Sequence, residues 1–157
     1  MDKIERISQY LIEYNVRRKD KTSRDALQQF LCDYSALNHR MEALRSHLEC
    51  LNDTYDQIKQ SAELRGNQDD PRLSAVKKQL KNTEAKLLGT LNTLSERCSI
   101  AMDIIDLIED ERIKTLFVFY YIQGKTIAET MDLIHYGRTM TITLHREGLQ
   151  FLRGLLS

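Results

Sequence analysis

The sequence contains no tryptophan, one proline and only six glycines among its 157 residues. Proline and glycine mark the frequent turns of all-β folds, so their scarcity argues against that class. Leucine, lysine, glutamate, arginine and glutamine dominate instead, and these residues have high helix propensity. Charged residues make up 29% of the chain, a fraction typical of long solvent-exposed helices. We therefore expect an all-α protein.

Cysteines and long apolar runs are also scarce. The three cysteines are Cys32, Cys50 and Cys98, an odd number without C-x-x-C spacing, which indicates neither a disulfide framework nor a zinc module. The charged start Met1–Arg6 lacks the apolar core of a signal peptide. The longest apolar run, Leu116–Ile122, is far too short to span a bilayer. We expect a cytoplasmic protein without a membrane segment.

Net charge is zero, with 23 basic and 23 acidic residues. This balance argues against a generally basic nucleic-acid binder. The charges are unevenly distributed, however, because Arg112–Ser157 holds six arginines and lysines against three acidic residues, a net charge of +3. An acidic stretch, Asp103–Glu111, precedes this segment and would partly cancel its field if it folds nearby.

Apolar residues in the first two thirds of the chain recur at helical spacing. Ile4, Ile7, Leu11 and Tyr14 predict a first helix over residues 2–16. A second helix over residues 24–64 has an apolar seam that steps by three and four for five heptads. Its members are Leu27, Phe30, Tyr34, Leu37, Met41, Leu44, Leu48, Leu51, Tyr55, Ile58 and Ala62. Such a seam is buried by coiling against another helix.

A third helix is expected over residues 71–108. Gly66 or Asn67 can end the second helix in a left-handed conformation, Asp70 is a suitable N-cap, and Pro71 fits the first helical position. The second seam contains a stutter at Leu87, where two steps of four follow each other. Its members are Leu73, Val76, Leu80, Thr83, Leu87, Leu91, Leu94, Cys98, Ala101, Ile105 and Ile108.

The short connection between these two helices predicts a long antiparallel, coiled-coil-like hairpin. Two helices leave their apolar seams half covered. The first helix or a second copy of the chain should complete the bundle, and we favour a homodimer. The predicted domains are therefore a helical region over residues 1–108 and a small C-terminal domain over residues 109–157.

The C-terminal segment has the layout of a helix-turn-helix. Ile113, Leu116, Phe117 and Tyr120 predict a helix that Gly124 ends. Thr126–Glu129 matches a capping box at the start of a short helix, whose inner face is Ile127, Met131 and Ile134. Residues 135–137 form the turn. The last helix, residues 138–156, is expected to direct Met140, Leu144, Gly148, Leu149 and Leu152 inward.

The outer face of that last helix carries the candidate DNA-binding residues. It comprises Arg138, Thr139, Ile142, Thr143, His145 and Arg146, at the helix end where a recognition helix contacts bases. Arginine pairs with guanine edges, threonine bonds to bases or phosphate, and isoleucine meets the thymine methyl group. From spacing alone, an ordinary solvent-exposed face of a small helical domain explains the pattern equally well.

The segment Asp110–Leu152 resembles region 4 of sigma-70-type RNA polymerase sigma factors, above all the sigma-region-4-like proteins of phages and prophages in Gram-positive bacteria. The resemblance rests on the apolar helix that ends in Tyr120–Gly124 and on later positions of the pattern. These later positions are Lys125, Thr126, Glu129, Tyr136, Arg138, Leu144, His145, Arg146 and Leu149. It implies a DNA-binding transcription regulator, with RNA polymerase as a further partner.

The resemblance also implies which side chains meet DNA. Arg138, Thr139, Ile142, Thr143 and Arg146 would lie in the major groove, and Thr126 would meet backbone phosphates. The chain departs from the family pattern at four positions. Thr130 and Met131 replace a buried isoleucine and alanine, His135 replaces the turn glycine, and Gly137 replaces the capping serine.

Two other functions remain open. The zero net charge and the departures at Met131 and His135 suit a structural or protein-interaction module whose helix-turn-helix no longer binds DNA. A small DNA-packaging subunit also combines a helix-turn-helix with an oligomerising helix. His39 and His47 lack a third ligand at metal spacing, and no phosphate loop or nucleophile motif is present. We expect no enzymatic activity, no metal site and no cofactor.

Overall fold

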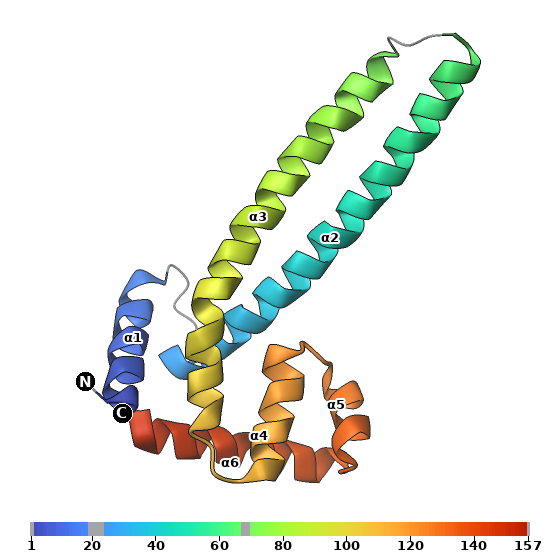
Figure 1. The fold of residues 1–157 in the computed structure, drawn as a ribbon. Coiled ribbons are helices and arrows are strands. Elements are labelled where there is room, and N and C mark those ends of the chain that lie inside the picture. Colours follow the sequence, from blue (N-terminus) through green and yellow to red (C-terminus); the bar gives the residue numbers. More distant parts are fainter. Residues whose placement is uncertain (1, 19–23, 67–69, 157) are drawn as a thin grey trace. The chain divides into compact units, whose positions relative to one another are not determined.

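A computed structural model of the chain describes residues 2–18, 24–66 and 70–156. Over these ranges the chain forms helices and no β-strand (Figure 1), which confirms the all-α prediction. The elements are α1 (Lys3–Arg17), α2 (Ala26–Leu64), α3 (Pro71–Asp106), α4 (Glu111–Phe117), the π-helical turn η1 (Val118–Ile122), α5 (Ile127–Ile134) and α6 (Arg138–Leu156). The ends of the three long helices differ from the predicted ends by two residues at most. No helix within the described ranges is both long and apolar enough to cross a membrane.

The chain folds as two compact units that do not match the predicted domains. Unit 1 combines Met1–Asn38 with Leu94–Ser157, and unit 2 is His39–Thr93. The C-terminal helices pack with α1 and with the nearer parts of α2 and α3, so the compact unit does not begin at residue 109. Two hydrogen bonds illustrate this: Ser8 Oγ donates to the Leu156 carbonyl at 3.1 Å, and Asn38 Nδ2 donates to the Ile122 carbonyl at 2.8 Å.

Unit 2 is an antiparallel pair formed by parts of α2 and α3 (Figure 1). In its α2 part, every predicted seam residue from Met41 to Ala62 is buried or half-buried, and every other residue of 39–64 is exposed. The apolar repeat of 3.5 residues therefore predicts the packing of this helix residue by residue.

The seam of α3 differs from the prediction at one position. Leu91 is 45% exposed, whereas Thr90 is buried with 7% exposed, so the steps of three and four continue through Thr90 to Leu94. The two consecutive steps of four therefore fall at Leu94, between Thr90 and Cys98, and not at Leu87 as predicted. Hydrophobicity favours Leu91 at this position, but the helical period places the neighbouring Thr90 on the seam, with its methyl group available for packing.

The two ends of the connection behave as predicted within the described residues. Gly66 has a φ of 70°, in the left-handed region that favours glycine. Asp70 Oδ1 accepts the Arg72 amide at 3.0 Å, directly before Pro71 begins α3. Hydrogen bonds from the Arg72 side chain and amide lower the pKa of Asp70 to about 2. Asn67, the alternative cap residue, lies outside the described residues.

Unit 1 contains an apolar core. It is formed by the buried residues Ile7, Leu11, Leu27, Phe30, Leu31, Tyr34, Ala101, Ile104, Ile105, Ile108, Ile113, Leu116, Phe117, Tyr121, Leu144, Leu149 and Leu152. An ion pair between Arg153 and Asp25 connects α6 with the start of α2. Burial of Asp25 favours its protonated form, but the hydrogen bonds from Arg153 and from the Gln28 amide outweigh this and lower its pKa.

Candidate nucleic-acid interface

A π-helical turn shapes the helix that supports the interface. Asp110 caps α4 by accepting the Arg112 amide at 2.9 Å. The Gln123 amide then donates to the Val118 carbonyl at 2.9 Å, five residues back, which widens the turn. As a result Tyr121, with 1% exposed, points into the core, whereas an α-helical spacing predicts Tyr120 there. Gly124 follows with a φ of 67°, as expected for a residue that ends a helix.

Tyr121 and His145 form a polar contact within this core. The Tyr121 hydroxyl lies 2.5 Å from His145 Nε2, and His145 is half-buried rather than on the outer face as predicted. Burial raises the pKa of Tyr121 and lowers the pKa of His145. The tyrosine therefore donates its proton to a neutral imidazole. Sequence periodicity missed this pair because it treats both positions as separate residues on separate helices.

We expect stability to depend on the protonation of His145. Its folded-state pKa lies below the ordinary value of about 6.5, so the unfolded chain takes up the proton first as the pH falls. The stabilisation is complete above about pH 6.5 and decreases below it, by at most about 1.4 kcal/mol per pH unit. Urea denaturation at pH 7.5 and pH 5.5 measures the effect. His145→Gln keeps an acceptor for Tyr121 and should flatten this dependence; an unchanged slope would contradict the assignment.

α5 begins as the sequence predicts. Thr126 Oγ1 accepts the Glu129 amide, and the Glu129 carboxylate accepts the Thr126 amide, both at 3.1 Å, which completes the capping box. The inner-face residues Ile127, Met131 and Ile134 are half-buried. Thr130 is fully buried, and its hydroxyl donates to the Thr126 carbonyl at 2.8 Å, so the buried polar group is satisfied.

The turn between α5 and α6 places a histidine in the left-handed region. His135 has a φ of 60° and a ψ of 34°, and among the described residues it is the only non-glycine with a positive φ. Its amide donates to the Met131 carbonyl at 2.9 Å. Glycine adopts this conformation without steric cost, whereas a residue with a Cβ does not, so His135 has a strained geometry.

Replacing His135 by glycine is expected to stabilise the protein by roughly 1 kcal/mol, because relief of the Cβ clash exceeds the added entropy of the unfolded chain. His135→Ala is the matched control. It also removes the imidazole but retains Cβ, so it should give no gain. Chemical denaturation of both variants measures the difference, and equal stabilities would show that the left-handed backbone carries no strain.

The inner face of α6 agrees with the prediction except at its start. Leu144, Gly148, Leu149 and Leu152 are buried as expected. Met140, however, is 37% exposed, and Thr141 is fully buried in its place. The Thr141 hydroxyl donates to the Gly137 carbonyl at 2.9 Å, which explains how a polar side chain can occupy that core position.

The six predicted DNA-binding residues are all accessible. Arg138, Thr139, Arg146 and Thr126 are exposed, Ile142 is 47% exposed, and Thr143 is half-buried. The five residues of α6 occur at relative positions 0, 1, 4, 5 and 8, which share one helix face. Arg138 and Arg146 make no hydrogen bond or ion pair with any described residue. The structure therefore presents two unpaired guanidinium groups on this face.

The charged residues near this face balance one another in number. Between Lys125 and Glu147, three basic residues are balanced by Glu129, Asp132 and Glu147. Binding by this face would thus depend on directed contacts more than on attraction to the phosphate backbone. Within the ranges that the structure covers, no group of three or more His, Cys, Asp or Glu residues is arranged to hold a metal ion.

Comparisons with protein-family models, with curated proteins and with solved structures found no match to this chain.

Proposed function

We propose that the protein is a DNA-binding transcription regulator of phage or prophage type, similar to sigma-70 region 4. In this proposal the first half of α6 enters the major groove of double-stranded DNA. Arg138 and Arg146 contact guanine edges, Thr139 and Thr143 bond to bases, and Ile142 packs on a thymine methyl group. Thr126, at the N-terminus of α5, meets a backbone phosphate. The proposal includes no catalytic activity, cofactor or metal.

The observation that carries the proposal is the contrast between the two faces of α6. One face packs in the core through Leu144, Gly148 and Leu152. On the opposite face two arginines have no partner among the described residues, and they lie beside accessible threonines and an exposed isoleucine. These residue types match the donors and apolar contacts that major-groove recognition uses. The short turn from α5 to α6, with its left-handed His135, adds the order of elements found in helix-turn-helix proteins.

A titration with fluorescent DNA tests the proposal. The probes are promoter fragments from the protein's own genomic neighbourhood and scrambled duplexes of equal length, measured over a series of salt concentrations. We expect tighter binding to one promoter fragment, with a shallow salt dependence because few phosphates are neutralised. Equal affinity for all fragments at every salt concentration would contradict the proposal. RNA polymerase, the partner implied by the family resemblance, can be added to the same assay.

A protein-interaction module is the second candidate function. Leu133 of α5 and Met140 and Ile142 of α6 are exposed apolar side chains, at 46%, 37% and 47%, on a nearly neutral surface. Such side chains suit contact with another protein as well as with thymine. Binding of purified RNA polymerase without DNA, lost on replacing Leu133 and Met140 by serine, would favour this function. Retention of DNA binding in the same double variant would instead support the first proposal.

A further inference from the structure

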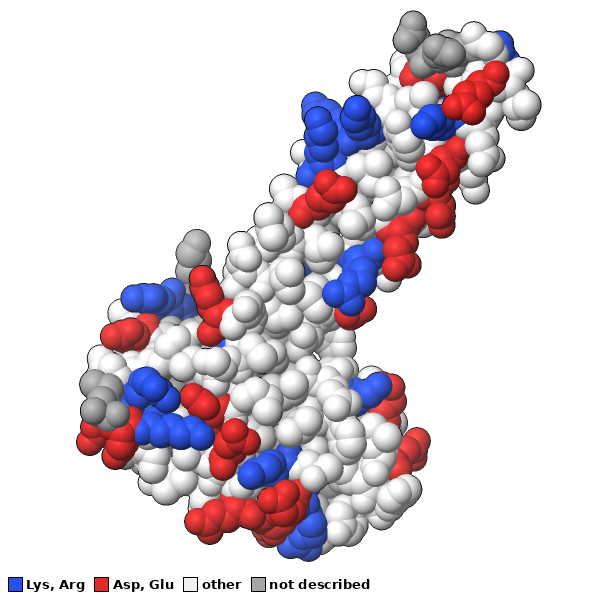
Figure 2. Space-filling model, viewed as in Figure 1, with Lys and Arg blue, Asp and Glu red and all other residues white. Residues whose placement is uncertain are grey.

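The two helices of unit 2 carry opposite charges. Between residues 39 and 64, α2 has three arginines and lysines against five acidic residues, whereas α3 between residues 71 and 93 has five against one. Figure 2 shows the lysines and arginines gathered over α3 and a row of acidic side chains along α2. Because the two helices are neighbours in one hairpin, these charges could form ion pairs between α2 and α3.

Most of these charges are nevertheless unpaired. The ion pairs of unit 2 among described residues are Arg45–Glu42, Arg65–Asp70 and Arg72–Asp70. No described residue forms an ion pair with the remaining lysines and acids on the two helices. Within unit 2 these residues are Lys77, Lys78, Lys81, Glu84 and Lys86 on α3, and Glu49, Asp53, Asp56, Lys59 and Glu63 on α2. The hairpin therefore exposes a basic helix and an acidic helix, each without partners for most of its charges.

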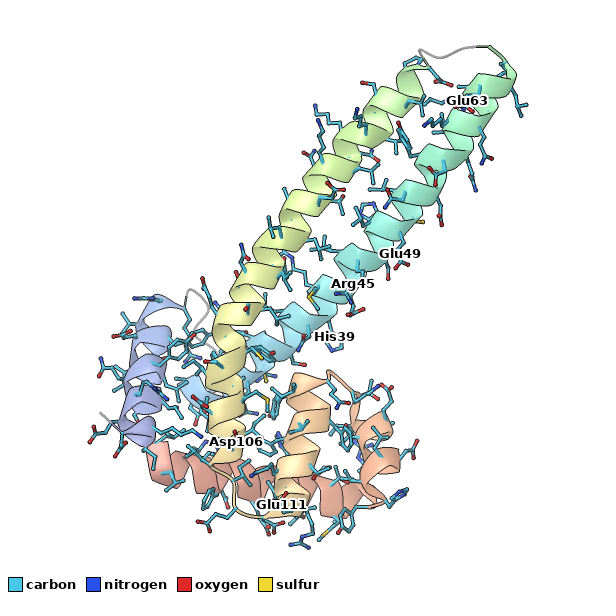
Figure 3. The ribbon with its side chains drawn as sticks, in the orientation of Figure 1. His39, Arg45, Glu49, Glu63, Asp106 and Glu111 are labelled. Atoms are coloured by element: carbon cyan, nitrogen blue, oxygen red, sulfur yellow. The ribbon has the colours of Figure 1, made fainter. Side chains whose placement is uncertain are left out.

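Many of the charged residues that have no partner lie on one face of the hairpin. Glu42, Glu49, Asp56 and Glu63 recur every seven residues, each one residue after a seam position of α2. Lys77 and Lys81 occupy the equivalent flank of α3, directly after Val76 and Leu80. In an antiparallel helix pair, equivalent flanks of the two seams lie on the same side. Figure 3 shows Glu49 and Glu63 at successive levels along α2.

The same flank of α3 carries exposed leucines. Leu88 directly follows the seam residue Leu87 and is 59% exposed, and Leu91 directly follows Thr90 and is 45% exposed. Between the two flanks lie seam residues that the hairpin leaves half covered, such as Leu44, Leu48 and Leu80. The face thus combines an acidic edge, a basic edge and apolar side chains, as expected for a protein interface.

We propose that a second copy of this chain covers this face, with the two hairpins parallel and α3 of each copy against α2 of the other. A two-fold axis along the hairpins brings each lysine-rich edge onto the partner's acidic edge. The antiparallel alternative, with the axis across the hairpins, places α3 on α3 and α2 on α2, so like charges meet. Charge complementarity therefore selects the parallel four-helix arrangement. The open ends of both hairpins, at residues 39 and 93, then lie at one end of the bundle. The proposal does not depend on DNA binding.

Reciprocal charge reversal tests both the dimer and its geometry. One variant of the full chain carries Lys77→Glu and Lys81→Glu; another carries Glu49→Lys and Asp56→Lys. The first variant leaves α3 with three basic and three acidic residues between 71 and 93, and the second leaves α2 with five basic and three acidic residues between 39 and 64. Neither variant keeps a basic helix against an acidic one, and each is expected to self-associate at least about tenfold more weakly than the wild type, as measured by sedimentation equilibrium. An equimolar mixture should restore association as a heterodimer, because α2 and α3 of the first variant, with net charges of −2 and 0 over these ranges, then face α3 and α2 of the second, with +4 and +2. Lys86→Glu, on the opposite flank of α3, is the matched control and should leave association unchanged.

Several outcomes would overturn the proposal. A wild-type chain that stays monomeric at every concentration would do so, as would variants that dimerise like the wild type. Mixed variants that remain monomeric, although circular dichroism shows both to be helical, would exclude the parallel pairing. If charge reversal at Lys77 and Lys81 abolishes DNA binding but the variant self-associates like the wild type, the basic edge binds nucleic acid and not a second copy. Loss of DNA binding in Arg138 and Arg146 variants has no bearing on this result.

Discussion

Replacing Arg138 and Arg146 together by alanine is expected to weaken binding of the target DNA by roughly 2–6 kcal/mol, since each bidentate contact with a guanine contributes about 1–3 kcal/mol. Both arginines are exposed and have no partner among the described residues, so their removal should leave folding stability almost unchanged. Equilibrium titration of the same promoter fragment with both proteins measures the loss.

The matched control for this variant is Arg40→Ala. Arg40 is also exposed and unpaired among the described residues, but it lies in unit 2, on α2. Its removal should weaken DNA binding at least about tenfold less than removal of the two arginines on α6 does. If Arg40→Ala and the α6 double variant lose equal affinity, nonspecific charge explains the binding. If neither variant loses affinity, α6 is not the recognition element.

Replacing Gly148 by alanine is expected to destabilise the protein by about 1–3 kcal/mol, the usual cost of overpacking a core. A Cβ at this position would lie 2.6 Å from Ile113 Cγ2 and 2.7 Å from the Phe117 ring. Both neighbours are buried, with 6% and 0% exposed, so neither can move aside without disturbing the core. The clash should push α6 away from α4, and urea denaturation measures the resulting loss of stability.

Gly154→Ala provides the control in the same helix. A Cβ at Gly154 meets no atom within 4 Å. This substitution should therefore stabilise the protein by roughly 0.5–1 kcal/mol through the higher helix propensity of alanine. A loss of stability in Gly148→Ala together with a gain in Gly154→Ala would demonstrate close packing of α6 against α4. A stabilising Gly148→Ala would mean that the two helices pack farther apart than the structure indicates.

Strong periodicity makes the long helices predictable. In α2 the seam from Met41 to Ala62 follows from spacing alone, because a helix that buries one stripe must repeat its apolar residues every 3.5 positions. The capping box at Thr126 and the Asp70 cap before Pro71 are local features, since their hydrogen bonds connect residues three positions apart or fewer. Local chemistry of this kind can be deduced without knowledge of the neighbours.

The predictions failed where two adjacent residues competed for one position. Thr90 replaces Leu91 on the seam, Tyr121 replaces Tyr120 in the core, and Thr141 replaces Met140. In each case we favoured a spacing or a hydrophobicity that the surrounding helices do not follow. A π-helical turn shifts one of these positions, and a hydrogen bond to the Gly137 carbonyl allows a buried threonine at another.

The helical class, the seam of α2, the capping residues and the accessibility of the five predicted DNA-binding residues of α6 can be deduced from the order of residues, because helix formation and its periodicity depend on neighbours only a few positions away. Tertiary packing, by contrast, decides which segments of the chain make up unit 1. Contacts such as Ser8 with Leu156, Asn38 with Ile122 and Tyr121 with His145 join residues far apart in the chain. No local pattern specifies which apolar face covers which, since hydrophobic burial is non-directional and the choice depends on how all the helices fit together.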